Sequence, residues 1–340
     1  MDIQEIKEVI QSSHLNFLMG AGTSAPFLPS LGDIETRLTN ETRKTERIKI
    51  KKEYFEKIII PNLDIIEGRL GTSQSNFNQA VEGYKNFFEL ISLVLLKRKN
   101  TLLSKQANIF TTNIDILMEI ALEGSNLEYN DGFSGRFNSV FSLSNFKKST
   151  FKRSLHFEHK SEVPSFNLIK MHGSLSWEKI EDKISFSKLK HLDRSLIKRG
   201  NKTFEREYSK LAIVNPEREK FEKTVVDLTH YELLRMYSSE LEKENAVLFV
   251  VGFSMEDEHV REITIRTANS NPSLKIYYFC HSKTSSSKMR DKMRLGELRY
   301  SNVEIIEPED DTEANKYKIE RIGKSIFKEI LNSMTHDNKS

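Results

Sequence analysis

The chain has 340 residues, of which 37% are hydrophobic and 30% are charged, and its formal net charge is +3. This length and composition exclude a wholly disordered chain and are typical of one large α/β domain or of a core domain with a sizeable insertion. A net charge this small gives no indication of a nucleic-acid partner, so we do not expect direct nucleic-acid binding.

A single cysteine, Cys280, excludes an intrachain disulfide and any zinc site that needs two cysteines of this chain. The apolar runs 87–96 and 246–253 are interrupted or far shorter than the roughly 20 residues that span a bilayer. The first residues lack the basic and apolar stretches of a secretory signal. We therefore expect a cytoplasmic protein without a membrane span, without structural zinc and with a fold that survives chelation.

The first elements suggest a strand that opens into a glycine turn. Residues 2–13 carry Ile and Val at helical spacing, which predicts an amphipathic helix. The apolar run 16–19 then leads into the segment 20–24, as a buried parallel strand does before a phosphate-binding turn. Because glycine has no side chain, the backbone N–H groups there could approach a pyrophosphate. Glycine pairs also occur at ordinary tight turns, so this segment alone leaves both interpretations open.

The segment 41–105 has no strand pattern, and we interpret it as an all-helical insertion. Pro61 is expected to separate two helices, and residues 77–96 carry a long helical pattern. That pattern has more apolar positions than one core-facing stripe requires, which predicts a homo-oligomer. The basic run 43–52 is typical of a solvated helix face or a protein interface.

Polar residues follow the next two apolar runs. Thr112, Asn113 and Asp115 end the run 108–112, before a helix expected at 115–123, and His172 follows the run 167–171. The carboxyl ends of parallel strands are where open α/β sheets bind ligands. Asn and Asp also cap helices, and a lone histidine is more often structural than catalytic. At a strand end, an imidazole can accept or relay a proton.

The remaining pattern completes an α/β organisation. Runs at 247–251 and 276–280 alternate with helical stretches, which predicts a Rossmann-like, doubly wound parallel sheet. Residues from about 135 to 165 are expected to form a loop and short strands near the site. Residues 178–210 give no clear pattern. A C-terminal helix over 312–334 should pack on the core.

Taken in order, Gly20-Ala21-Gly22, the Thr-x-Asn-x-Asp segment 111–115 and His172-Gly173 resemble the sirtuin family. The segment 252–254 resembles the Gly-aromatic-Ser segment of the bacterial sirtuin-like branch, where it lies beside the adenine-side ribose. A strand-end turn before a helix cap is the alternative. The resemblance covers most of the chain and implies a single sirtuin-like domain over 1–340.

The resemblance implies that NAD is the substrate. It implies that Asn113 and Asp115 hold the nicotinamide ribose and carboxamide and that His172 acts at the ribose hydroxyls. Breaking the nicotinamide–ribose bond develops oxocarbenium character, so the ribose must be held rigidly. With water as the acceptor, Asn113 can orient it and His172 can assist its deprotonation. The other residues assigned to NAD binding are Gly20, Ala21, Gly22, Thr23, Ser24, Thr112, Gly252 and Ser254.

The chain departs from the family in two ways. Zinc-bearing sirtuins have two pairs of closely spaced cysteines, so their metal-bound small domain cannot be present here. The usual Asp-Phe-Arg segment after the phosphate loop is also missing, and residues 26–33 take its place. There, Asp33 either substitutes as a nicotinamide-side group or caps a helix at 34–39. The loop with Tyr129, Asp131, Phe133 and Arg136 resembles the NAD-pocket loops of sirtuin-like hydrolases, or is an ordinary surface turn.

A sirtuin-like core without the zinc module resembles the NAD-depleting effectors of bacterial antiphage defence. That resemblance implies an NAD glycohydrolase that releases nicotinamide and ADP-ribose. With little room for a sensor of its own, activation is expected to need self-assembly or a separate partner, and the resemblance suggests a HerA-type DNA-translocating ATPase. The alternatives are a zinc-free protein deacylase or ADP-ribosyl transferase, and a non-catalytic NAD- or ADP-ribose-binding regulatory module.

Overall fold

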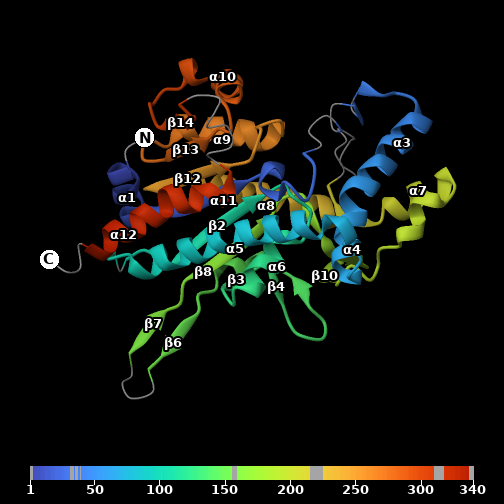
Figure 1. The fold of residues 1–340 in the computed structure, drawn as a ribbon, viewed down its shortest axis with the longest axis horizontal. Helices are drawn as coiled ribbons and strands as arrows, with labels where there is room; N and C mark the ends of the chain where they lie inside the picture. The colour runs from blue at the N-terminus through green and yellow to red at the C-terminus, as the bar shows by residue number, and fades with distance from the viewer. Residues whose placement is uncertain are drawn as a thin grey trace.

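The computed structural model describes residues 3–30, 34, 37–38, 40–100, 102–154, 159–214, 225–309 and 318–336. Within these residues the chain forms a seven-stranded parallel sheet with helices on both faces (Figure 1). This arrangement confirms the predicted Rossmann-like α/β fold.

The strand order places the first strand in the middle of the sheet. The order is β14-β13-β12-β1-β2-β8-β3, so β1 has β2 on one side and β12 on the other. A reversal of winding direction beside β1 creates a switch point, outside whose carboxyl ends ligands bind. The short β3 and β14 were not predicted, whereas the other strands match the apolar runs. The bounds are β1 His14–Met19, β2 Gln106–Thr111, β3 Glu128–Asn130, β8 Ser165–Lys170, β12 Ala246–Val251, β13 Lys275–Phe279 and β14 Val303–Ile306.

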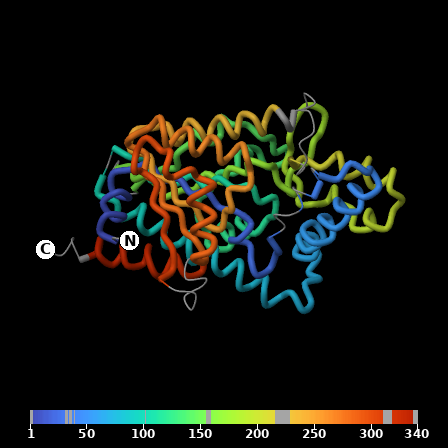
Figure 2. Tube along the Cα trace, turned by 90° about the horizontal axis from the view of Figure 1, so that it is seen from above, coloured from blue at the N-terminus to red at the C-terminus, as the bar shows by residue number. Residues whose placement is uncertain are grey.

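Alternate strand residues supply two separate hydrophobic cores, one on each face of the sheet. Phe17 and Phe249 face one layer of helices, whereas Leu18 and Val250 face the other. Figure 2 shows the two helical layers on opposite sides of the sheet. The first layer contains α1 Ile3–Ser12, α5 Gln74–Lys97, α6 Leu117–Gly124 and the C-terminal helices; the second contains α8 Val225–Leu241, α9 Glu258–Ser270 and α10 Lys283–Lys292.

The C-terminal helical run packs on both the sheet and α5. It comprises α11 Ile319–Ile322, the π-helical turn η8 Gly323–Phe327 and α12 Lys328–His336. The ring of Phe327 lies 5.5 Å from that of Phe87 in α5 and 5.6 Å from that of Phe249 in β12. The C-terminal helices and α6 therefore cover apolar positions of α5 that had suggested a second copy. The homo-oligomer stays a prediction, now without that support.

The described part of 41–105 forms α3 Lys44–Tyr54, the π-helical turn η2 Phe55–Ile59, α4 Ile60–Glu67, the 3₁₀ turn η3 Gly71–Ser73 and α5. Pro61 does not separate two helices, so that prediction was wrong. The N–H of Ile60 donates to the carbonyl of Phe55, one residue farther back than in an α-helix. Pro61 then falls in the first turn of α4, where a missing N–H is tolerated. That the segment is an insertion stays a prediction.

A second, antiparallel sheet combines strands that precede β8 in the chain with strands that follow it. Its order is β11-β9-β10-β5-β4. The helix α7 Asn201–Tyr208 lies between β10 and β11 in the chain and contacts α3. A separate two-stranded ribbon, β6 Phe151–Arg153 with β7 Lys160–Glu162, projects from the body of the molecule (Figure 1). The five strands are β4 Phe133–Ser134, β5 Val140–Phe141, β9 Gly173–Ile180, β10 Lys183–Phe186 and β11 Leu211–Ile213.

Candidate functional site

The carboxyl ends of β1, β2, β8, β12 and β13 meet at one edge of the sheet, where a cavity of about 2050 Å³ opens. Single small-molecule pockets usually occupy about 300–1,000 Å³, so this cavity is large enough for a dinucleotide. The structure thus brings together residues that the sequence places far apart. Among the predicted site residues, those that line the cavity are Ala21, Gly22, Thr23, Ser24, Thr112, Asn113, Asp115, His172, Gly252 and Ser254.

The glycine turn after β1 packs against the turn after β12. The N–H of Gly22 donates to the carbonyl of Gly252 over 2.9 Å, and the N–H of Gly20 donates to that of Val251 over 3.1 Å. A Cβ on Gly20 would lie 2.5 Å from the Gly252 oxygen, which only glycine avoids. Gly20 itself is not among the cavity-lining residues. These glycines hold two strand-end turns together, and the N–H groups of Gly20 and Gly22 are used within the protein.

Thr23 and Ser24 tie this turn to the helical layer through Tyr84 of α5. The hydroxyl of Tyr84 shares hydrogen bonds with Thr23 Oγ1 over 2.7 Å and with Ser24 Oγ over 3.1 Å. Tyr84 is fully buried, and burial raises the pKa of its phenol, so it stays protonated as a donor. Sequence reasoning missed Tyr84 because a tyrosine within a long amphipathic helix gives no sign of reaching a distant turn.

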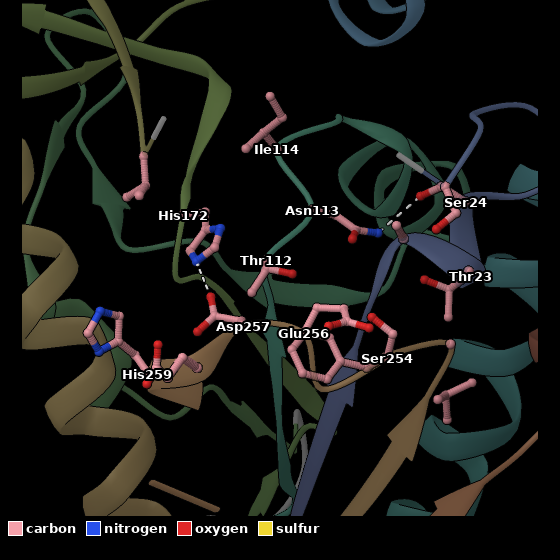
Figure 3. A pocket seen from close by; sticks show the side chains of 18 of the residues that line it. Thr23, Ser24, Thr112, Asn113, Ile114, His172, Ser254, Glu256, Asp257 and His259 are labelled. Atoms are coloured by element: carbon pink, nitrogen blue, oxygen red, sulfur yellow. Dashed lines mark hydrogen bonds and ion pairs between the residues drawn. The ribbon is translucent and has the colours of Figure 1, made fainter. Parts of the chain in front are cut away.

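Asn113 hydrogen-bonds to the glycine turn after β1. Its Nδ2 donates to the carbonyl of Gly20 and to Ser24 Oγ, each over 3.1 Å, and the residue is 8% exposed (Figure 3). The amide group is therefore held in one orientation at the cavity wall. With Nδ2 engaged, the carbonyl oxygen Oδ1 is the atom available to accept a hydrogen bond from a ligand or water.

Asp115 caps the following helix, as one interpretation of its sequence position predicts, and its contact with NAD stays a prediction. Its Oδ1 accepts from the N–H of Leu117 at the start of α6 over 3.1 Å, while its Oδ2 accepts from Ser24 Oγ over 2.8 Å. The carboxylate thus caps the helix and also links it to the turn after β1. Both oxygens already have protein partners, so we assign Asp115 the positioning of Ser24 before any contact with a ligand.

A buried ion pair supports the loop that carries Asn113 and Asp115. Lys170, at the end of β8, is 3% exposed, and its Nζ lies 2.8 Å from Glu119 Oε1 and also contacts the backbone oxygen of Asp115. Burial raises the pKa of Glu119, and the charge of Lys170 opposes that rise. Through these contacts Lys170 links the end of β8 to the loop after β2. Breaking the ion pair would leave a buried charge without a partner, which destabilises the fold strongly.

His172 contacts Asp257 directly at the cavity, a pairing that sequence reasoning did not predict. His172 Nε2 lies 2.7 Å from Asp257 Oδ2, as Figure 3 shows, and Asp257 also accepts from the N–H of Val260 as the N-cap of α9. Burial raises the pKa of Asp257, but the hydrogen bond and charge of His172 outweigh that effect and help to hold the pKa well below its usual range. The ionised carboxylate accepts a hydrogen bond from His172 Nε2–H, and in the neutral form of the imidazole Nδ1 is then the nitrogen that can accept a proton.

Two more histidines lie close to this pair. The ring of His230 in α8 lies 5.5 Å from that of His172, and its Nδ1 hydrogen-bonds the carbonyl of Met171 over 2.5 Å. Burial lowers the pKa of His230, and His172 lowers it further, which disfavours the protonated form of His230. His259 also lines the cavity. Residues from α8 and α9 therefore build one wall of a site whose other wall comes from β2 and β8.

The turn after β12 is fixed by cations from the helices that follow it. Lys292 of α10 donates from Nζ to the carbonyl of Ser254 over 3.0 Å, and Arg261 of α9 donates to the carbonyl of Met255 over 2.9 Å. Gly252 has a φ of 60°, which favours glycine. The predicted turn and the predicted helix cap are thus both present, since Asp257 follows in the same segment.

Other predicted positions lie elsewhere. Asp33 falls outside the described residues. Asp131 accepts from the N–H of Phe133 in the loop before β4, Arg136 is exposed, and neither lines the cavity. Nor does the ribbon β6–β7, so the expectation that 135–165 lies near the site was wrong for this part.

Two kinds of feature are absent from the residues that the structure describes: a metal-binding cluster and a membrane-spanning helix. No cluster of three or more His, Cys, Asp or Glu side chains suited to a metal ion occurs in the described part of the chain. Among the helices of that part, none has both the length and the apolar character needed to cross a membrane.

The comparisons with known proteins agree with this architecture. A family model described as SIR2-like domain matches residues 107–306, a range that begins in β2, ends in β14 and leaves out the glycine turn at 20–24. No curated protein matches the chain. Because the matched range is more than half of the sequence, the chain belongs to the SIR2-like domain family, and an NAD-related function follows from that membership.

Proposed function

We propose that the protein is an NAD glycohydrolase that cleaves the nicotinamide–ribose bond. The observation that carries the proposal is the convergence of Asn113 and the His172–Asp257 pair on one strand-end cavity in a SIR2-like domain. In the reaction, the C–N bond breaks with its electron pair going to the nicotinamide nitrogen. The oxygen of water bonds to the ribose carbon and loses a proton, which gives nicotinamide, ADP-ribose and H⁺.

The cavity suits NAD in size and in the placement of its polar groups. Asn113 and His172 line it with an amide and an imidazole, whereas Ser282, the N-cap of α10, and Lys288, within α10, line it with a hydroxyl and an ammonium. Apolar side chains such as Phe253 also line the cavity and can pack against a flat ring. This distribution supports an extended ligand with a reactive end near His172.

The proposed division of labour follows from the hydrogen bonds. Asp257 accepts a hydrogen bond from His172 Nε2–H, so that Nδ1 of the neutral imidazole can take a proton from water or from a ribose hydroxyl. Asn113, fixed through Nδ2, can direct its Oδ1 at the attacking water. Both groups are held before substrate arrives, which reduces the ordering needed to reach the transition state.

Product analysis of the purified chain with NAD separates this proposal from its alternatives. We expect nicotinamide and ADP-ribose in equal amounts without any protein acceptor. Consumption of NAD only when a protein acceptor is present would indicate a deacylase or ADP-ribosyl transferase instead. Saturable binding of NAD without turnover, with or without a partner ATPase, would indicate a regulatory module.

The biological role rests on the resemblance described above. We propose that NAD depletion by this protein serves antiphage defence and that a HerA-like ATPase activates it. The cavity and its residues support the chemistry of depletion.

A further inference from the structure

A strongly basic ribbon lies outside the NAD site. We define the arm as residues 147–154 and 159–162, which include β6 and β7. The arm has five basic side chains and one acidic one, Glu162. The basic residues are Lys147, Lys148, Lys152, Arg153 and Lys160. The small net charge of the whole chain conceals this local excess, because acidic residues elsewhere offset it.

The basic side chains of the arm are exposed and have no acidic partner among the residues that the structure describes. Lys147, Lys152, Arg153 and Lys160 form no ion pair within the described part of the chain, and Lys148 bonds only to the neutral side chain of Asn145. Cations on the helical segment that includes α3 differ, since each of three lies within 3.0 Å of a carboxylate. These pairs are Lys44–Glu205, Lys49–Glu46 and Lys57–Glu53.

The pairing of the two strands brings like charges together. Arg153 in β6 lies directly opposite Lys160 in β7. Like charges at directly opposed positions destabilise an antiparallel pair. This pair therefore costs the ribbon stability and favours the binding of an external anion, which would neutralise both charges.

The base of the arm is anchored at the edge of the sheet opposite the cavity. Gln106, the first residue of β2, donates from Nε2 to the carbonyl of Lys148 over 2.7 Å. The N–H of Lys105 donates to Glu162 Oε2 over 2.9 Å, so the one acid of the arm is engaged in holding its base. The cavity lies at the carboxyl ends of the strands, so a partner on the arm would leave the cavity open.

We propose that the arm binds the phosphate backbone of double-stranded DNA without sequence preference. A two-stranded ribbon fits the major groove, which is about 12 Å wide, and basic side chains on both strands would face phosphates on its two sides. A protein partner fits less well, because lysine is depleted at protein interfaces and a protein interface has an apolar centre. Phe151 is the one large apolar side chain exposed on the described arm.

The proposal is tested with a fluorescent DNA duplex of random sequence, titrated with the purified full-length chain at several salt concentrations. We compare the parent with an arm variant, Lys152→Gln, Arg153→Gln and Lys160→Gln. The matched control is Lys44→Gln, Lys49→Gln and Lys57→Gln, which removes the same charge from paired positions. We expect the arm variant to bind at least tenfold more weakly and its salt dependence to fall by about one per lost phosphate contact. The control should bind like the parent.

Three outcomes would overturn the proposal: no binding of the parent to the duplex at low salt, an equal loss in both variants, or tighter binding of a single strand of the same length than of the duplex. Circular dichroism melting shows that each variant is folded. Because no readout involves NAD, this result stands apart from the test of the hydrolase.

Discussion

Asp257 serves two roles through one side chain: it begins α9 and it faces His172. Its sequence context indicated only a turn and a helix cap, since the partner histidine lies on a different strand. Tyr84 and Lys170 were missed for the same reason, because their roles depend on which strand ends and helices the fold brings together. Asn113 and His172 were predictable as candidates because a polar residue directly after a buried strand is informative without any knowledge of its neighbours.

Replacing Asp257 with Asn tests its charge while preserving the helix cap, because Asn also caps helices well. We expect NAD hydrolysis to fall by about a hundredfold, since His172 loses the carboxylate that orients it. Asp193→Asn is a matched control, because Asp193 accepts from the N–H of Ser195 as a cap and does not line the cavity. Unchanged hydrolysis in Asp257→Asn would leave the pair without a catalytic role.

The lowered pKa of Asp257 also predicts that the difference in unfolding free energy between the parent and Asp257→Asn depends on pH. The pKa of Asp257 is lower in the folded protein than in the unfolded chain, so its ionised form stabilises the fold. This contribution is complete above the unfolded pKa of about 4 and is lost as the pH falls through the folded value. The parent should therefore exceed Asp257→Asn in unfolding free energy near neutral pH, and the difference should shrink below about pH 4. A difference that grows in acid would contradict the assignment.

At the scale of elements, the turns after β1 and β12 form one unit through backbone contacts. A Cβ on Gly20 or Gly22 would crowd the backbone of Gly252 where the two turns meet, whereas a role of these glycines in the approach of a pyrophosphate stays a prediction. The motif was recognisable from the sequence, but its physical reason was not. A turn that packs against another turn and one that packs against a ligand both need glycine.

Gly20→Ala separates these two reasons. A methyl group there would meet backbone atoms of Gly252 and Phe253 at 2.5–2.6 Å, so we expect a loss of about 1–3 kcal/mol in unfolding free energy, measured by chemical denaturation. Gly200→Ala is the control, because no heavy atom lies within 4 Å of the added Cβ. A Gly20→Ala protein of full stability that has lost NAD binding would show that the glycine serves the ligand.

The predictable elements are those whose own residues determine them. Strands β1, β2, β8, β12 and β13 are buried apolar runs in the middle of the sheet and could be located without the structure. The edge strands β3 and β14 could not, since few of their residues are buried. Pro61 misled the helix prediction because a π-helical turn, which has no clear sequence signal, precedes it.

For the whole molecule, the sheet separates two surfaces. Its carboxyl edge carries the candidate site, and its amino edge carries the base of the basic arm. The family match supports the core of this arrangement from β2 to β14. The function of the molecule therefore depends most on whether the residues gathered at the carboxyl edge act on NAD.

The most direct test measures NAD hydrolysis beside a melting curve for Asn113→Ala and His172→Ala, under conditions in which the parent is active. The control is Asn62→Ala, which removes a fully buried amide that accepts from the N–H of Ile116 but does not line the cavity. We expect Asn113→Ala and Asn62→Ala to lose similar stability, about 1 kcal/mol for each lost hydrogen bond. Hydrolysis should fall by about a hundredfold to ten-thousandfold in Asn113→Ala and His172→Ala and stay near the parent rate in Asn62→Ala. Full hydrolysis in both Asn113→Ala and His172→Ala would contradict the assignment of this cavity as the hydrolase site.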